Sequence, residues 1–184
     1  FNEAAHELYK FTWNKFCDWY LEFSKVIFTS GEENEINETK SMISYVLTNT
    51  LIMLHPIIPF FTEHVWQEAS NLLIRNNEKI NREKWPLKLE KISNENQINI
   101  LINLITAIRS TRSELNVPAN VEIDMCYINV SEELNSIINT YKETIGILTK
   151  SRSIKNSEFK KDKGMIQVLF SDGLIYLSLK DIID

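Results

Sequence analysis

The side chains most able to carry catalysis or bind a metal are few and scattered. His6, His55 and His64 lack the H-E-x-x-H spacing that places two zinc ligands on one helix face. Cys17 and Cys126 form no C-x-x-C pair, so we expect two reduced thiols without a metal role. For His55, directly before a proline, we expect a capping or core role and not that of a ligand or base. The residues therefore predict no metal site.

The sequence also lacks the short motifs that position a catalytic nucleophile or a bound nucleotide. It contains no G-x-S-x-G, no phosphate-binding glycine loop and no G-x-G-x-x-G. Carboxylates are abundant, but they fall on the polar faces of the expected helices, and acid–base catalysis needs two of them in one pocket. We therefore predict that this chain catalyses no reaction alone.

Composition restricts the class of protein. Of 184 residues, 43% are hydrophobic and 24% charged, which is typical of a globular domain, and only four Gly and four Pro favour long helices. No stretch reaches the roughly 20 apolar residues that span a membrane, so we expect no membrane partner. The two isolated cysteines, expected to be reduced, indicate a cytoplasmic location. The net charge of −5 argues mildly against nucleic-acid binding, but phosphate contacts depend on local basic patches. Because the chain begins at Phe1 in mid-pattern, without Met or a signal region, we expect an excised fragment.

Hydrophobic residues at three- and four-residue steps predict four long helices in the first part of the chain. The expected ranges are 2–27, 39–54, 60–74 and 97–115. In the first helix, an aromatic stripe that includes Tyr9, Trp13 and Tyr20 is expected to be buried. Pro56 and Pro59 predict a corner after the second helix, because proline disrupts a helix interior. The inward-facing residues of the third helix are expected to be Phe61, Val65, Trp66 and Leu72.

After residue 119 the hydrophobic period changes from 3.6 to 2, which predicts strands. The expected strands are 121–127, 165–170 and 174–179, the last two joined as a hairpin. Ser131 is expected to cap a helix that continues to Ile145, and the basic run 150–163 is expected to be turn-like.

The predicted fold class is mainly α. We expect an antiparallel helical bundle over residues 1–119, followed by a small α+β subdomain over residues 120–184.

Four segments, in order along the chain, resemble valyl-tRNA synthetases. They are F-C-D-W-Y-L-E at 16–22, the proline corner L-H-P-I-I-P-F with T-E and W at 54–66, W-P at 85–86, and I-R-x-x-R-x-E-x-N-V-P at 108–118. The proline corner is similar in the valyl, isoleucyl, leucyl and methionyl enzymes, whereas residues 16–22 and 108–118 together select the valyl member. Residues 1–13 and 173–184 also resemble segments of this family, so the resemblance covers essentially the whole chain.

The resemblance implies the anticodon-binding bundle of a class I synthetase, which positions tRNA(Val) for ATP-dependent aminoacylation. The family's H-I-G-H and K-M-S-K-S motifs are absent, so the catalytic and editing domains, and with them ATP and Mg²⁺, are expected outside this fragment. No cofactor is expected in the fragment itself. The first helix of the bundle and most of a C-terminal coiled-coil arm are also expected to be missing. The implied partners are tRNA(Val) and those missing domains of the same protein.

Polar and aromatic side chains in the two selective segments and in the basic run are candidate tRNA contacts. The candidates are Lys15, Asp18, Trp19, Leu21, Glu22, Lys25, Arg109, Arg112, Lys150 and Arg152. By resemblance, the end of residues 16–22 approaches the anticodon, so Leu21 could contact a base and Lys25 a phosphate. The alternative for this face is a solvated helix surface with a Glu22–Lys25 ion pair.

The remaining candidates also have structural alternatives. Arg109 and Arg112 could contact the tRNA backbone or dock another domain, or form an ion pair with Glu114. The basic run from Lys150, which also holds Lys155, Lys160, Lys161 and Lys163, could touch a tRNA stem or be a solubilising loop. Among the aromatic residues, Trp19 lies off the stripe expected to be buried and stays a candidate for base stacking.

Two other functions are open from sequence alone. The chain could be the equivalent domain of an isoleucyl or leucyl enzyme. It could also be a helical protein-interaction module with no RNA role, which the acidic net charge favours slightly.

Overall fold

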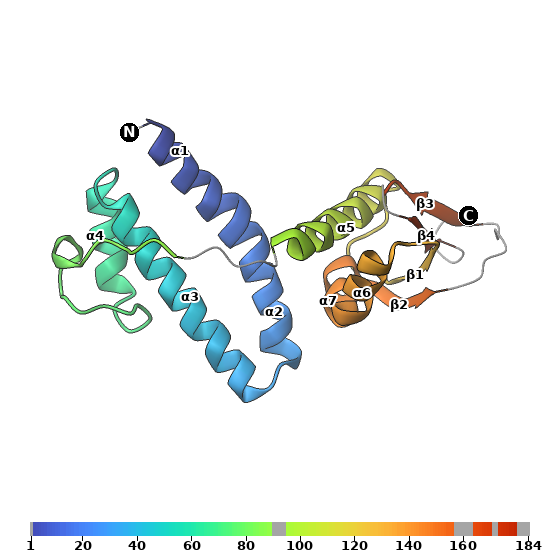
Figure 1. The fold of residues 1–184 in the computed structure, drawn as a ribbon, viewed down its shortest axis with the longest axis horizontal. Coiled ribbons are helices and arrows are strands. Elements are labelled where there is room, and N and C mark those ends of the chain that lie inside the picture. Colours follow the sequence, from blue (N-terminus) through green and yellow to red (C-terminus); the bar gives the residue numbers. More distant parts are fainter. Residues whose placement is uncertain (1, 90–94, 157–163, 171–172, 180–184) are drawn as a thin grey trace. The chain divides into compact units, whose positions relative to one another are not determined.

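The computed structural model describes residues 2–89, 95–156, 164–170 and 173–179. The chain forms two compact units, Phe1–Lys91 and Ile92–Asp184, and each is described by itself (Figure 1). Within the described residues, none of the helices is both long enough and apolar enough to cross a membrane.

The first unit begins with one continuous helical rod in three segments. These are α1 (Asn2–Lys10), the π-helix η1 (Phe11–Tyr20) and α2 (Leu21–Ser30). At the end of η1 the backbone N–H of Leu21 donates to the carbonyl of Phe16, five residues earlier. The rod predicted over residues 2–27 is thus confirmed as helical, but its middle follows the wider π-helical turn.

The π-helical segment changes which side chains share a face of the rod. Phe16 and Val26 are buried as expected, but the side chain of Trp13 is 57% exposed and stacks on exposed Tyr9, with ring centroids 6.4 Å apart. The prediction that the whole aromatic stripe is buried is wrong. It assumed 3.6 residues per turn, and i→i+5 bonds put more residues into each turn.

The second long helix, α3 (Glu33–Leu54), starts six residues earlier than predicted. A capping box explains the early start: the Glu32 side chain accepts from the N3 backbone, and the Glu35 carboxylate accepts from the N–H of Glu32 at 3.0 Å. The polar residues after Gly31 therefore enter the helix. α3 packs against both α1 and α2.

The predicted proline corner lies between α3 and α4 (Pro59–Glu68). His55 ends α3, and its Nδ1 lies 2.8 Å from the hydroxyl of buried Thr62, so the histidine has the structural role expected of it. Thr62 donates in turn to the carbonyl of Ile58. This pairing links the end of α3 to the first turns of α4.

The core of the first unit forms where α3, α4 and the 3₁₀ turn η2 (Ile80–Arg82) meet. It consists of Leu51, Ile52, Trp66, Leu73 and Ile80. Trp66 is fully buried as predicted and donates to the carbonyl of Asn77 at 3.3 Å. Phe61 and Leu72 are exposed, contrary to the prediction, because α4 buries only the Thr62–Trp66 face and ends before Leu72.

The second unit combines three helices with a mixed four-stranded sheet. The helices are α5 (Glu95–Glu114), α6 (Glu132–Thr140) and α7 (Lys142–Thr149). The strands are β1 (Ile123–Ile128), β2 (Ser151–Asn156), β3 (Met165–Val168) and β4 (Leu174–Ser178). The sheet order is β2-β1-β4-β3, with β1 and β2 parallel and the other neighbours antiparallel. The described chain is thus mainly α-helical with a small mixed sheet.

The strand register brings apolar side chains into rows. Met125 of β1 pairs with Ile154 of β2 and with Leu177 of β4, and all three side chains are buried. The alternation predicted for β1 is confirmed, since Ile123, Met125 and Tyr127 are buried and the residues between them are half-buried. The β3–β4 hairpin is also confirmed as an antiparallel pair, while two of its turn residues, 171–172, lie outside the described residues.

Two expectations for the second unit are corrected. Part of the basic run predicted as a turn is strand β2, in which only Ser151 and Ile154 are buried, so no period-2 hydrophobic pattern marks it. The helix predicted from Ser131 to Ile145 breaks into α6 and α7 at Tyr141. Within this unit, α5 packs on α6, α7 and β3.

Arg112 is the buried polar residue of the second unit with the most extensive bonding. It lies one helical turn beyond buried Ile108, and its side chain is only 6% exposed. Its guanidinium donates to the carbonyls of Pro118 at 3.1 Å, Val121 at 2.7 Å and Lys150 at 3.5 Å. Burial lowers the pKa of Arg112 below its ordinary value, but arginine stays charged in proteins. The residue thus links the end of α5, the 118–121 connection and the α7–β2 junction.

We predict that Arg112→Ala lowers the free energy of unfolding by about 2–4 kcal/mol, because it removes a charged donor from three partly buried carbonyls. Arg112→Lys should recover less than half of this loss, since one ammonium cannot reproduce the planar fork. Urea denaturation followed by circular dichroism measures the effect. Arg109→Ala is the matched control, because exposed Arg109 sits one turn away. Equal stability of the Arg112→Ala and Arg109→Ala chains would contradict the structural role.

Candidate nucleic-acid interface

Six of the candidate contacts lie on the helical rod, across the junction of η1 and α2. Three of them, Lys15, Asp18 and Lys25, are exposed. The other three, Trp19, Leu21 and Glu22, are half-buried. The segment therefore offers both cations and carboxylates to solvent, beside apolar groups that are only partly covered.

Lys25 and Glu22 form the helical ion pair that the sequence left open as an alternative. The side chain of Lys25 is 68% exposed and that of Glu22 is 30% exposed. Lys10 and Glu7 form a comparable i,i+3 pair at 3.0 Å near the start of the same rod. Exposed pairs of this kind contribute little to stability, so Lys25 can exchange its partner for a phosphate at small cost.

The aromatic residues of the segment divide into two packed pairs. Tyr20 stacks on buried Phe16 with ring centroids 5.9 Å apart, and burial, followed by the nearby Glu38 carboxylate, raises the pKa of the Tyr20 phenol. Trp19 contacts Phe23 at a centroid distance of 5.8 Å and an interplanar angle of 37°. Trp19 is thus held in place by Phe23 and keeps part of its surface exposed.

Arg109 and Arg112 do not share an exposed face, although their i,i+3 spacing suggested a pair. Exposed Arg109 donates through Nε to the carbonyl of Leu148 at 2.8 Å. Arg112 is buried and bonded to three backbone carbonyls, a different structural role from the ion pair with Glu114 that we considered. Its position on the apolar stripe, four residues after Ile108, was the sequence signal for burial.

Lys150 and Arg152 lie at the junction of α7 and β2. Lys150 has a left-handed backbone, with φ 53°, which ends α7 and directs the chain into the strand. Arg152 donates to Asp124 of β1 at 2.7 and 3.3 Å, and the Ser153 hydroxyl donates to the same carboxylate at 2.6 Å. These bonds hold the pKa of Asp124 below its ordinary value. Lys160, Lys161 and Lys163 lie outside the described residues.

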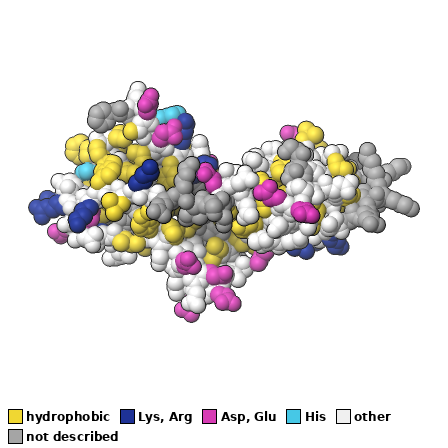
Figure 2. Space-filling view, in the orientation of Figure 1, with side chains coloured by type: hydrophobic (Ala, Val, Ile, Leu, Met, Phe, Trp, Pro, Cys, Tyr) yellow, Lys and Arg dark blue, Asp and Glu magenta, His cyan; other side chains and the backbone are white. Residues whose placement is uncertain are grey.

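A hollow of 560 Å³ opens between α7 and β2, which we call the α7–β2 hollow. Its lining includes Lys142, Lys150, Arg152 and Lys155. Lys142 was missed as a candidate because no motif contains it. Lys155 was mentioned only as part of a loop, because β2 was not predicted. Figure 2 shows Lys and Arg side chains gathered over β2.

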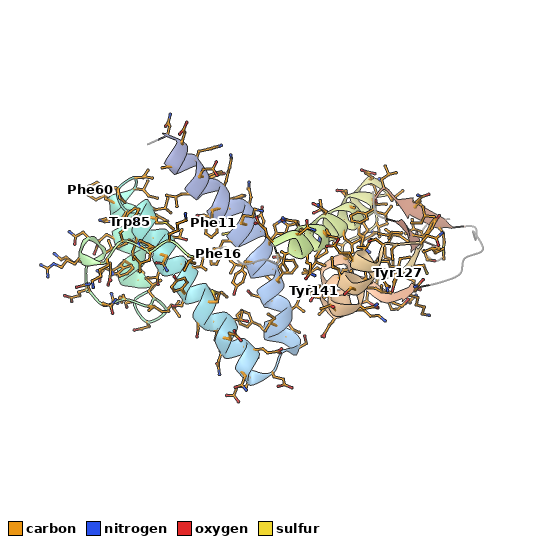
Figure 3. The ribbon with its side chains drawn as sticks, viewed as in Figure 1. Phe11, Phe16, Phe60, Trp85, Tyr127 and Tyr141 are labelled. Carbon is orange, nitrogen blue, oxygen red and sulfur yellow. The ribbon has the colours of Figure 1, made fainter. Side chains whose placement is uncertain are left out.

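A second hollow, of 380 Å³, lies in the first unit and is mainly apolar. Phe11 and Tyr45 line one part of it, and the extended segment that begins at Trp85 lines another (Figure 3). Trp85 is 61% exposed, so the W-P dipeptide is extended as predicted but its indole remains largely accessible. Among the described residues, no group of three or more His, Cys, Asp or Glu side chains could hold a metal ion.

Comparison with known proteins identifies the family. The model described as "Anticodon-binding domain of tRNA ligase" matches residues 1–127. The valine--tRNA ligase of Zymomonas mobilis is 36% identical over 191 residues, which cover the whole of this chain and 21% of that protein. The valine--tRNA ligase of Wigglesworthia glossinidia brevipalpis is 39% identical over 166 residues, which cover 84% of this chain and 19% of that protein.

These relatives confirm the resemblance to valyl-tRNA synthetases inferred from residues 16–22 and 108–118, and they do not favour an isoleucyl or leucyl enzyme. The chain spans about a fifth of the length of the curated relatives it matches. With more than half of its residues matched by the family model, the chain belongs to the family of anticodon-binding domains of tRNA ligases.

Proposed function

We propose that this chain recognises the anticodon region of tRNA(Val) within a valine--tRNA ligase. The observation that carries the proposal is the family match over residues 1–127, together with similarity to valine--tRNA ligases along the whole chain. In this role the chain positions tRNA for aminoacylation by the catalytic domain of the same protein. That domain consumes ATP, with Mg²⁺, and the same protein also carries an editing domain. The whole ligase acts in the cytoplasm.

The anticodon-binding domain proper is proposed to extend over residues 1–119, as an antiparallel bundle of the class I type, with residues 120–184 as a subdomain. The family match supports this functional boundary, because it runs past the division between the compact units as far as residue 127. Packing of α3 on both α1 and α2 supports the bundle.

The contact proposed for the anticodon loop is the η1–α2 junction. Unpaired loop bases are read by stacking and by hydrogen bonds to their edges, while cations position the phosphates. Exposed Lys15 and Lys25 suit phosphates, and the exposed Asp18 carboxylate suits an amino group on a base edge. Trp19, held by Phe23, offers a stacking surface.

The other candidate contacts keep narrower roles in this proposal. Half-buried Leu21 contributes apolar contact to a base, and Glu22 accepts from a base once Lys25 turns to a phosphate. Arg109, Lys150 and Arg152 are proposed to contact the RNA backbone. Arg112 is proposed to act indirectly, by holding the carbonyl of Lys150.

A protein-interaction module without an RNA role is the alternative that the acidic net charge suggested. The family match and the valine--tRNA ligase relatives do not favour it. A salt titration separates the two functions, because each phosphate contact adds to the slope of log K against log [salt]. Binding of a tRNA(Val) transcript that does not change with salt would rule out the RNA function.

We predict that Lys25→Ala weakens binding of tRNA(Val) about fivefold at 0.1 M salt and reduces the salt slope by about 1. Lys10→Ala is the matched control, since Lys10 has the same i,i+3 glutamate partner on the same rod. It should bind as the unmodified chain does. Filter binding across a salt series measures both quantities. An equal loss in the two variants would assign the effect to net charge and not to a local contact.

In the whole ligase, we predict that Lys25→Ala and Arg109→Ala each raise the KM for tRNA(Val) and leave valine activation unchanged. The reason is that both residues contact tRNA and neither belongs to the catalytic domain. Valine-dependent pyrophosphate exchange measures activation without tRNA, and aminoacylation at varied tRNA concentration gives KM. Impaired pyrophosphate exchange in either variant would show that the residue acts on the catalytic domain instead.

A further inference from the structure

The α7–β2 hollow is built from two adjacent elements of the second unit. The lining from α7 is Lys142, Glu143, Gly146 and Ile147, which lie on one side of the helix, and residues 150–155 continue the wall along β2. β2 is the outermost strand of the sheet and pairs only with β1 among the described strands. The hollow therefore lies beside an open sheet edge.

The charges around the hollow are mostly positive. Its lining carries the cations Lys142, Lys150, Arg152 and Lys155. Its carboxylates are Glu122 and Glu143. This excess stands out in a chain whose net charge is −5. A concave surface lined by one sign of charge concentrates ligands of the opposite sign.

The fold positions two of the cations. The backbone of Lys150 is held, since its carbonyl accepts from the Ile123 N–H at 3.1 Å and from Arg112. The guanidinium of Arg152 is oriented by its two bonds to Asp124 and contributes positive charge to the lining of the hollow.

The other two cations, Lys142 and Lys155, form no ion pair with a carboxylate of the described residues. Lys155 lies close enough to Asp124 to contribute to the lowered pKa of that carboxyl, after the bonds from Arg152 and Ser153. Gly146 lets α7 approach β2 closely, because a Cβ at this position would lie 3.2 Å from the carbonyl oxygen of Ser151. The hollow, of 560 Å³, has room for a bulky anion between the cations of its lining.

We propose that the α7–β2 hollow binds backbone phosphates of the same RNA whose anticodon region is contacted elsewhere in the chain. The inference rests on the proposed function and adds a second contact surface, with Lys142 and Lys155 as its principal ligands. Compact ammonium groups on flexible stems suit phosphates as point charges and do not read bases. The contact is therefore independent of RNA sequence.

An extended acidic peptide added to the β2 edge is the competing occupant, since open edges accept strands. Charged side chains along an edge strand oppose such pairing, and β2 presents exposed Arg152 and Lys155. Phosphates need no backbone pairing, so these side chains favour RNA over a peptide.

The test is a Lys142→Gln/Lys155→Gln double variant of the full chain, titrated with tRNA(Val) transcript at several salt concentrations. We expect affinity to fall about tenfold at 0.1 M salt and the salt slope to fall by about 2. The loss should be equal for a transcript with an altered anticodon. Lys142→Arg/Lys155→Arg should restore binding, because it keeps both charges. Lys79→Gln/Lys84→Gln, which removes two exposed charges from the first unit, is the matched control and should have no more than a twofold effect.

The outcomes separate this proposal from the proposed function. If the unmodified chain discriminates between anticodons but the double variant binds like the Lys79/Lys84 control, the hollow is not an RNA site and anticodon recognition stands. If the double variant loses binding of poly-glutamate and retains that of tRNA, the hollow belongs to an acidic protein partner. If the unmodified chain ignores the anticodon while the double variant loses affinity, the phosphate contact stands and the proposed function fails.

Discussion

The second unit depends on one buried charge, the guanidinium of Arg112. It binds the carbonyls of Pro118, Val121 and Lys150, which come from two connections far apart in the sequence. Two of these carbonyls also accept one backbone bond each, Pro118 from the N–H of Val121 and Lys150 from the N–H of Ile123, both at 3.1 Å. A neutral side chain at this position would remove one donor from each of the three carbonyls in a partly buried setting. The parallel start of β1 and β2, where Ile123 pairs with Ser151, is therefore also stabilised by Arg112.

This constraint extends to the surface of the unit. The Lys150 carbonyl accepts from Arg112, the backbone of this residue is left-handed, and β2 begins directly after it at Ser151. The short connection brings the side of α7 and the edge of β2 together around the α7–β2 hollow. Asp124 then orients Arg152 from the neighbouring strand. Hydrogen bonds to the buried backbone thus help to place the cations that make the hollow basic.

The sequence predicted the elements whose hydrophobic period is regular. α5, β1 and the β3–β4 pair follow the expected ranges within a few residues, because each buries one face. Prediction failed where other interactions decide the structure. The π-helical turns of η1 changed the exposed face at Trp13, and edge strand β2 buries too few side chains to show a period. Of the candidate contacts, those on the rod were placed correctly as partly or fully exposed, whereas Arg112 was predicted from motif spacing without regard to its place on an apolar stripe.

Arg112 also shows that a motif which identifies a family need not be its ligand-binding surface. Residues 108–118 helped to select the valyl family, yet Ile108, Arg112 and Val117 are buried and shape the fold. By contrast, Lys142 and Lys155 belong to no motif and form no ion pair with a carboxylate of the described residues. Phosphate contact requires only a positive charge on an accessible stem, so many positions can supply it. A buried guanidinium that donates to three carbonyls can be supplied from few positions, because each hydrogen bond restricts the orientation of the side chain. A sequence motif should therefore identify the buried residues that shape the proposed RNA-binding surface more readily than the lysines that would contact phosphates.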